Sequence, residues 1–347
     1  MTLIRAMLVL VAILVCLHGA IRLMTTNPMA IDVIIPLRAV ERWLAGGVAY
    51  LPDGFTDPQA LPPFLYPPFV LPFLAPLTAL PEWFVRWAWV AGMLSIGWLS
   101  YLWLGLKFVP AALALLWIPM VEGIWTGNIG VLLFAAFIIA FWNRSDGGLP
   151  AAPREFEDSN QTPPRVGFLA ASLAAVKPSQ IHAWLVILRR QPRSALIGLA
   201  PWIFVAVVTL PLVGLDAYGE WIAQVRRAAD PSWPMMGVSL LAYVPPAIFG
   251  LIYVASILLA WRLAGRDLGA WAGVLIFIAT PNMHSFNGLF LLPALLLIRR
   301  EYALLAAILM STYTAEGWWL GAAVVIGTMV AGARWPIARE PQLARGV

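Results

Sequence analysis

Charged residues are scarce in this chain. Only 11% of its 347 residues are Asp, Glu, Lys or Arg, whereas 61% are hydrophobic. A soluble domain carries about 25% charged residues, so the composition indicates an integral membrane protein. The basic residues behind the net charge of +5 form small clusters between apolar runs, such as Arg189–Arg193. Clusters of this kind are typical of membrane topology signals, which argues against nucleic-acid binding.

Cysteine and histidine are also rare. The single Cys16 lies inside the first apolar run, which excludes an internal disulfide and a cysteine-based metal site. His18, His182 and His284 share no metal-ligand spacing, so we expect no metal site. Residues 1–23 begin like a signal peptide, but no small-x-small cleavage site follows, so we expect them to persist as a helix.

Apolar runs recur along the whole chain. They fall at 3–23, 66–80, 84–106, 109–124, 128–142, 166–188, 195–213, 247–263, 269–282, 285–298, 302–313 and 317–332. Several are shorter than the ~20 residues that a full span needs. Short helices are tolerated where protein or a watery cavity covers their ends. The sequence therefore predicts one all-α polytopic domain over 1–347, with about twelve membrane helices and a deep cavity.

Two topologies fit these runs, and they differ only between residues 66 and 188. In the first, 66–80 crosses the membrane and 166–188 is a single helix. In the second, 66–80 only dips into the membrane, and 166–188 is a hairpin broken at Lys177-Pro178. Four prolines within 66–80 argue against an unbroken helix there. We favour the second topology, which also leaves more basic residues in the cytoplasm, together with both termini.

Three connecting segments stand out. Residues 24–83 form the predicted first periplasmic loop, with an amphipathic surface helix whose apolar stripe is Ile34, Leu37, Val40, Trp43 and Leu44. The polar segment 143–165 lacks periodicity, which predicts a flexible cytoplasmic loop. The segment 214–246 predicts an outer surface helix followed by a second periplasmic loop.

The favoured topology gathers scattered polar groups at the outer face. Asp32, at the start of the surface helix, is interpreted as an N-cap, as a general base, or as both. Asn128 has a helix-capping interpretation as well. Lys177 interrupts an apolar run, where a cation is costly unless it meets an anion. A phosphate is the anion we expect, and a Lys that snorkels to the interface is the alternative.

A second polar interruption, Thr280–Asn287, carries His284. Its neighbours Asn282 and Asn287 favour a phosphate or sugar contact, whereas a hydrogen-bonded interface histidine is the alternative. Arg226 could attract anionic headgroups or be a solvated surface residue. The acids Glu122 and Glu316 receive no assignment from the sequence.

Several motifs together resemble glycosyltransferase family 87. They are an Asp after the first helix, Phe64-Leu-Tyr-Pro-Pro68, Pro-Leu-x-x-Leu-Pro at 76–81, Lys177-Pro178, and the His284 segment before Pro293. Gly127-Asn128 stands where the family tends to have Gly-Gln. Asn128, the short length and the terse 282–287 loop are departures. The family resembles polyprenol-phosphate-mannose-dependent mannosyltransferases with a GT-C-type fold.

The resemblance implies an enzyme that moves a sugar, with mannose expected, from a polyprenyl phosphate to a hydroxyl of a lipid or glycan acceptor. Asp32 would be the general base at the periplasmic face of a bacterial inner membrane. Donor contacts would come from Lys177, His284, Asn287, Arg226, Tyr66 and Asn128. Because the leaving phosphate is already a good anion, we expect no metal or other cofactor, and we expect inversion.

Two other classes of membrane protein are alternatives to the glycosyltransferase interpretation. In a transporter or lipid flippase, the intramembrane Lys177 and Glu122 would serve ion or headgroup passage. The lack of an internal repeat and the structured first loop disfavour transport. In a non-catalytic membrane subunit, Asp32 would be only a helix cap.

Overall fold

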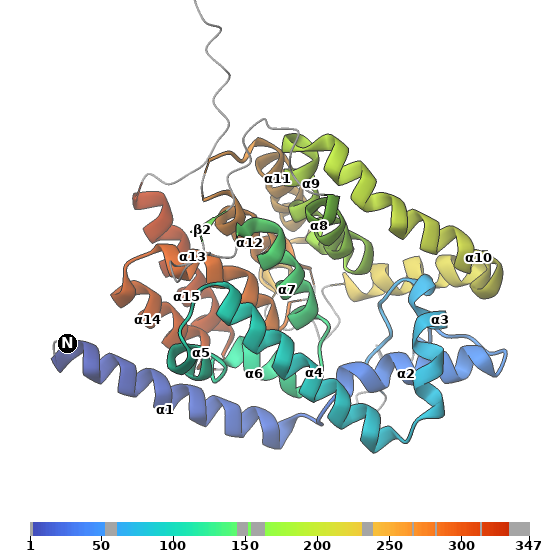
Figure 1. Ribbon diagram of the computed structural model, residues 1–347, viewed down its shortest axis with the longest axis horizontal. Helices are drawn as coiled ribbons and strands as arrows, with labels where there is room; N and C mark the ends of the chain where they lie inside the picture. Colours follow the sequence, from blue (N-terminus) through green and yellow to red (C-terminus); the bar gives the residue numbers. More distant parts are fainter. Residues whose placement is uncertain are drawn as a thin grey trace, which may run out of the picture.

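The computed structural model describes residues 3–52, 61–143, 152–153, 164–230, 239–265, 267–281, 283–312 and 314–332. These residues are almost entirely helical, apart from one pair of two-residue strands (Figure 1). The predicted all-α class is therefore confirmed.

The helices follow the apolar runs of the sequence. The longer ones are α1 (Leu3–Thr26), α2 (Ile31–Leu44), α4 (Glu82–Trp103), α10 (Pro192–Ala228), α11 (Pro246–Arg262) and α15 (Ala315–Ala331). The shorter ones are α5 (Phe108–Ala114), α6 (Ile118–Trp125), α7 (Gly130–Phe141), α8 (Pro164–Val176), α9 (Ile181–Arg190), α12 (Leu268–Ala279), α13 (Leu292–Leu297) and α14 (Arg300–Met310). The 3₁₀ turns η5 (Leu240–Ala242) and η6 (Ser285–Leu291) precede α11 and α13.

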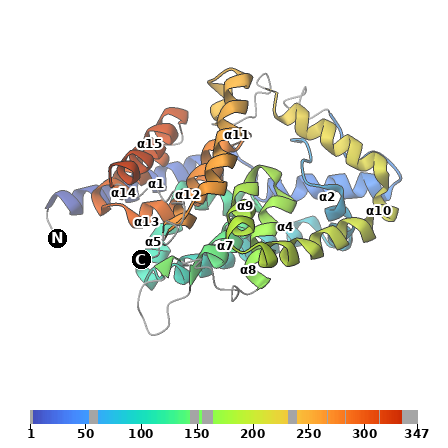
Figure 2. The ribbon, with the colours of Figure 1, turned by 90° about the horizontal axis from the view of Figure 1, so that it is seen from above.

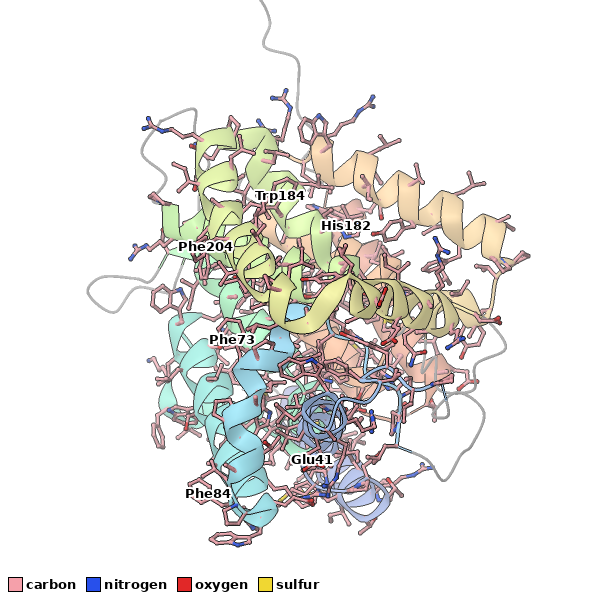
Figure 3. The ribbon with its side chains drawn as sticks, turned by 90° about the vertical axis from the view of Figure 1, so that its right-hand side faces the viewer. Glu41, Phe73, Phe84, His182, Trp184 and Phe204 are labelled. Atoms are coloured by element: carbon pink, nitrogen blue, oxygen red, sulfur yellow. The ribbon has the colours of Figure 1, made fainter. Side chains whose placement is uncertain are left out.

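The lengths of the helices and the exposed hydrophobic side chains both indicate a membrane protein. Among the described residues, two helical stretches, Ala6–Leu44 and Pro192–Ala228, are long and apolar enough to cross a membrane. Helices α5 and α6, bent by 72° at their junction, could form a third span. Phe73, Phe84 and Phe204 are exposed on the outside of the bundle (Figure 3). Exposed aromatic side chains of this kind suit contact with lipid, so the chain is a membrane protein.

The chain is broken where the favoured topology needs a break. Lys177 has φ −135° and ψ 86°, and the 3₁₀ turn η4 (Pro178–Gln180) separates α8 from α9. Pro178 cannot donate a backbone hydrogen bond, which helps to end α8 at that point. The proline-rich run likewise divides into η2 (Pro68–Val70), α3 (Leu71–Leu74) and η3 (Ala75–Ala79). Both findings contradict the unbroken helices of the first topology.

Helix α10 consists of two helices joined at Gly214, whose φ of 79° and ψ of 158° are not helical. Glycine adopts this positive φ without a steric penalty. At Gly214 the chain bends sharply, so the second half of α10 runs in a different direction from the first (Figure 2). This half supplies the helix predicted at the start of 214–246, whereas residues 231–238 of that segment lie outside the described part.

Two segments show local features that the sequence did not indicate. Within 143–165, strands β1 (Trp142–Asn143) and β2 (Ala152–Pro153) pair in antiparallel fashion, and α8 begins at Pro164. Residues 144–151 and 154–163 of that loop lie outside the described part. On α2, Leu44 of the predicted apolar stripe is 56% exposed, whereas Ile35 and Ala39 are buried. Helix α2 is thus covered by protein on a wider face than a surface helix would be.

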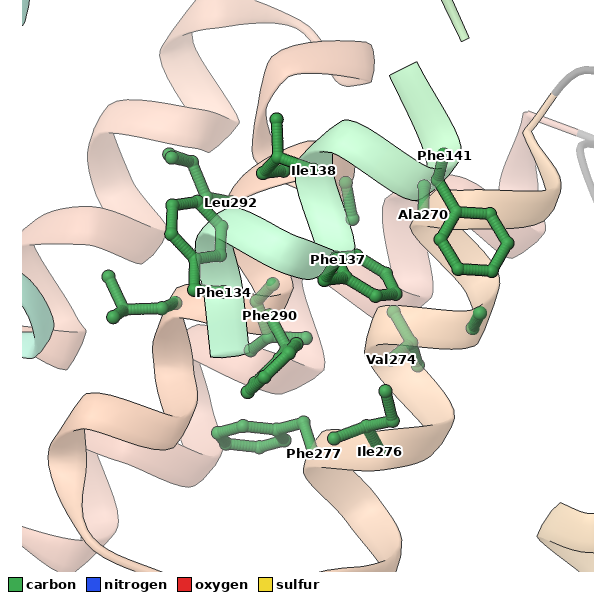
Figure 4. Packing of buried hydrophobic residues seen from close by; sticks show 14 of the residues in the cluster. Phe134, Phe137, Ile138, Phe141, Ala270, Val274, Ile276, Phe277, Phe290 and Leu292 are labelled. Atoms are coloured by element: carbon green, nitrogen blue, oxygen red, sulfur yellow. The ribbon is translucent and has the colours of Figure 1, made fainter. Parts of the chain in front are cut away.

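A cluster of aromatic side chains forms the centre of the bundle. Phe134 and Phe137 of α7 pack with Phe290 of η6 and Phe277 of α12, all at most 2% exposed (Figure 4). A Cβ atom on Gly273 would lie 2.0 Å from the carbonyl oxygen of Phe290, so only glycine permits this approach of α12 to η6. This packing fixes η6, which carries part of the candidate site.

Candidate functional site

The end of α6 positions Asp32. Before α2, Ala30 adopts the left-handed conformation with φ 57°, and its backbone N–H donates to the carbonyl of Trp125 at 2.7 Å. The backbone N–H of Asp32 donates to the carbonyl of Thr126 at 2.8 Å. These carbonyls at the C-terminal end of α6 have no partner within their own helix and are free to accept. The start of α2 is therefore docked on the end of α6.

The Asp32 carboxylate binds side chains of another segment. Its Oδ2 accepts hydrogen bonds from Thr126 Oγ1 at 2.7 Å and from Asn128 Nδ2 at 2.8 Å. The N-cap position of α2 belongs to Ala30, without a side-chain cap. The N-cap interpretation of Asp32 was therefore wrong. Asn128 is not the N-cap of α7 either, because that position belongs to Ile129. Its Oδ1 nevertheless accepts a hydrogen bond at 2.7 Å from the backbone N–H of Gly130, the first residue of α7.

Ion pairs between α2 and α4 add to this anchoring. Arg38 binds Glu41 at 2.8 Å and Glu82 at 2.5 Å, and Arg86 binds Glu82 at 2.7 Å. Arg86 also donates to the carbonyl of Met29, just before the turn into α2. A charge network with shared partners restrains geometry better than an isolated surface pair.

Lys177 points into the bundle. Its Nζ donates to Oδ1 of the fully buried Asn287 at 3.3 Å and lies 4.8 Å from the centroid of the Phe286 ring. These contacts contradict the snorkelling alternative. Burial lowers the pKa of Lys177 to about 8, and the negative charge of Asp32 opposes that shift. The ammonium is therefore still largely protonated at neutral pH, close enough to Asp32 for their charges to interact.

His284 lies against the same aromatic ring. Its imidazole stacks on Phe286 with 5.6 Å between centroids and 16° between planes. Burial and the charge of Lys177 lower the pKa of His284 to about 4. The imidazole is therefore neutral at pH 7 and offers one donor and one acceptor. Asn287 Nδ2 donates to the backbone carbonyl of His284 at 3.2 Å, which ties the short segment together.

An apolar cavity of about 600 Å³ opens beside Asp32. Its polar lining includes Asp32 and Tyr66, and the rest is largely aliphatic and aromatic, including Phe69, Leu133, Phe168, Val176, Trp202 and Val205. Burial, and then the negative charge of Asp32, raise the pKa of Tyr66, so its hydroxyl stays protonated. A cavity of this size with few polar groups suits the apolar part of an amphiphile.

Not every sequence-predicted residue joins this group. Arg226 is exposed in the last turn of α10, and no described contact links it to Asp32 or Lys177. Asn282 lies outside the described residues. No three His, Cys, Asp or Glu side chains gather to hold a metal ion within the part of the chain that the structure describes.

Sequence reasoning missed Thr126 and Phe286 and left Glu122 unassigned. Thr126 binds the Asp32 carboxylate, and Phe286 contacts both Lys177 and His284. Glu122 Oε2 accepts from the backbone N–H of Phe286 at 3.1 Å. Thr126 is adjacent to the Gly127-Asn128 pair of the sequence analysis, and Phe286 lies between the predicted site residues His284 and Asn287. Proximity in the sequence to a predicted site residue was therefore the signal that could have identified both.

Fold and site together define a helical membrane protein with a carboxylate in the wall of an apolar cavity. The ammonium of Lys177 interacts with the charge of this carboxylate, and Phe286 joins the ammonium to the imidazole of His284. Residues 64–281 match glycosyltransferase family 87. Because the match covers more than half of the chain, the protein belongs to glycosyltransferase family 87. No curated protein and no solved structure matches it. Tyr66, Asn128 and Lys177 lie within the matched residues, whereas Asp32 and His284 lie outside them.

Proposed function

We propose that this glycosyltransferase moves a sugar, with mannose as the first candidate, from a polyprenyl phosphate to a hydroxyl of a lipid or glycan acceptor. In this proposal the reaction takes place at the periplasmic face of a bacterial inner membrane, in a GT-C-type bundle of about twelve membrane helices. Family membership supports glycosyl transfer and favours an enzyme over a transporter. The observation that carries the rest is the position of the Asp32 carboxylate in the wall of an apolar cavity.

The donor is an amphiphile, and the site has a part for each of its ends. The cavity would receive the first isoprene units of the polyprenyl chain, because its lining is almost wholly apolar. Lys177 would bind the phosphate as a point charge, and neutral His284 would donate a hydrogen bond to it. Asn287 holds the Lys177 ammonium and would position it. Tyr66 and Asn128 would contact the sugar, and Arg226 would attract the donor from outside.

The reaction needs a base for the acceptor hydroxyl. The acceptor oxygen attacks the anomeric carbon, the bond from that carbon to the phosphate oxygen breaks, and polyprenyl phosphate leaves with the bonding electrons. The acceptor proton goes to Asp32. Both described hydrogen bonds of this carboxylate fall on Oδ2, so we assign Oδ1 as the oxygen that accepts the proton. Lys177 would stabilise the negative charge that develops on the phosphate.

The test is transfer by purified protein in liposomes that contain polyprenyl-phosphate-mannose and extracted membrane lipids as acceptors. Asp32→Asn keeps the size of the side chain and one oxygen that can accept from Thr126 and Asn128, but it removes the base, so we expect its turnover to fall by a factor of about 10² to 10⁴. Asp216→Asn is the matched control, since Asp216 is exposed on the second half of α10, and it should transfer like the wild type.

Two outcomes would contradict the proposal. A folded Asp32→Asn protein with wild-type turnover would exclude Asp32 as the base. Absence of transfer by the wild type from any polyprenyl-phosphate sugar would exclude the donor class.

A further inference from the structure

Glu122 is a buried acid that the proposed chemistry does not use. It is 8% exposed in α6, and its Oε2 accepts a hydrogen bond from the backbone N–H of Phe286 at 3.1 Å. Burial of an acid is costly unless the group is hydrogen-bonded, so this contact fixes the side chain of Glu122 and the backbone at Phe286 together. The contact joins residues 164 positions apart in the chain.

One face of α6 therefore holds both halves of the candidate site. Glu122 of α6 and Thr126, the C-cap residue of this helix, are one helical turn apart and lie on the same side. Thr126 donates to the Asp32 carboxylate, and Glu122 accepts from the backbone of Phe286. The spacing between the base and the donor-binding segment is thus set by the last turn of α6, from Glu122 to the C-cap residue Thr126.

Phe286 is held tightly once its backbone is fixed. A Cβ atom on Gly130 would lie 2.9 Å from Cδ2 of the Phe286 ring, and one on Gly123 would lie 3.5 Å from its Cβ. The ring therefore packs directly against the backbone of α7 at Gly130, and the Cβ atom of Phe286 lies next to α6 at Gly123. The same ring contacts the Lys177 ammonium and the His284 imidazole. A shift of Phe286 would displace both groups.

We propose that Glu122 is a positioning residue, which holds Phe286 so that Lys177 and His284 face the donor phosphate at a fixed distance from Asp32. This inference rests on the proposed function. The role requires a hydrogen-bond acceptor at Glu122 Oε2 and does not require proton transfer by Glu122.

Three variants test the inference in the transfer assay described above. Glu122→Leu removes the acceptor, so the Michaelis constant for the donor should rise on the order of tenfold, the effect of losing one buried hydrogen bond. The Michaelis constant for the acceptor should stay within about twofold, since Asp32 keeps its contacts with Thr126 and Asn128. Glu122→Gln keeps an acceptor oxygen and should restore near wild-type donor use. Glu316→Gln, at an exposed acid of α15, is the control and should have no effect.

A double variant separates positioning from general loss of stability. Phe286→Leu removes the ring and should also raise the Michaelis constant for the donor. If Glu122 acts through Phe286, the two changes combined should be no worse than the more damaging one alone. Should Glu122→Leu fail to fold, Glu122→Gln and Phe286→Leu still decide the question.

Several results would overturn the inference. They are an unchanged donor constant in folded Glu122→Leu, a Glu122→Gln variant as impaired as Glu122→Leu, a Glu122→Gln variant that fails to fold, and full additivity of the two changes. A wild type that transfers no sugar would instead overturn the proposed function, so the two failures are distinguishable.

Discussion

At the scale of single residues, the site keeps two opposite charges apart although they interact. The Asp32 carboxylate is bound by Thr126 and Asn128, whereas the Lys177 ammonium is bound by Asn287. A direct ion pair would neutralise both groups and leave neither free for a substrate. Separate polar partners keep each charge available, and in the proposed reaction the first would accept a proton and the second would bind a phosphate.

The ammonium of Lys177 makes the enzyme sensitive to alkaline pH. Its pKa is lowered to about 8, chiefly by burial, so the group loses its charge as the pH rises through that value. Among the neighbouring groups, the negative charge of Asp32 favours the protonated Lys177. His284, with a pKa of about 4, is already neutral near pH 8. We predict that kcat/KM for the donor falls above pH 8, because the neutral amine no longer attracts phosphate.

Lys177→Arg provides the control for this pH dependence. Arginine stays protonated throughout the accessible range, so the variant should lose activity from altered geometry but show no fall between pH 7.5 and about 9.5. The measurement is kcat/KM for the donor against pH for both proteins. An identical alkaline fall in the two would assign the titration to another group.

The positions of these residues were more predictable than their partners. The polarity of Asp32, Lys177 and His284 within apolar surroundings singled them out, because ionisable groups are expensive in a membrane. The contacts of Asp32 with Thr126 and of Lys177 with Phe286 join residues about a hundred positions apart, and no local pattern encodes such pairs. The capping preference of Asp suggested a role within α2 that the contact with α6 replaced.

At the scale of elements, the wall of the cavity depends on a close crossing of α8 and α10. A Cβ atom on Gly198 would lie 2.1 Å from the carbonyl carbon of Gly167, so the two backbones touch at this point. Next to it, Phe168 and Trp202 stack with 5.8 Å between centroids, and both line the cavity. Small residues at a helix crossing permit this approach, as in other membrane helix pairs.

Gly198→Ala should therefore separate α8 from α10. The added methyl group has no space, so we predict a loss of about 1–3 kcal/mol in the free energy of unfolding, the usual cost of overpacking. Gly219→Ala, in the second half of α10, is the matched control, because nothing lies within 4 Å of its Cβ position. Alanine favours the helix there, so this change should stabilise by about 0.5–1 kcal/mol.

Unfolding in detergent, followed by circular dichroism, measures both effects. The prediction is wrong if the two variants have the same stability, since the crossing would then have room to adjust.

Breaks in helices were readable from the sequence, whereas pairing between segments was not. Pro178 lacks a backbone donor and lies within an apolar run, and the chain is broken beside it. The proline-rich run at 66–80 is divided for the same reason. Strands β1 and β2 are two residues each, too short for any alternating pattern. The polar composition around them therefore indicated only a loop.

At the scale of the whole molecule, the apolar runs predicted the class and order of the helices, but the cavity depends on how distant helices pack. Segments from α2, α4, α7, α8 and α10 line the cavity, together with the proline-rich 68–79 segment. Each of these is apolar on its own, and apolarity alone does not distinguish a side facing lipid from one facing a cavity. Asp32 lies in the wall of this cavity, so in the proposed function access for the polyprenyl chain and placement of the base would be linked.

A bulky residue in the cavity wall tests whether the polyprenyl chain lies there. Ala136 of α7 lines the cavity, so Ala136→Trp should fill part of the space without touching the described contacts of Asp32 or Lys177. We predict that kcat/KM falls about tenfold or more for a long-chain donor, a loss of about 1.4 kcal/mol in binding, and less for a donor with a single isoprene unit. Leu212→Trp, at a residue 63% exposed on α10, should leave both donors unaffected. If Ala136→Trp instead raises only the Michaelis constant of a lipid acceptor, the cavity holds the acceptor chain, and the donor chain must enter by another side of the bundle.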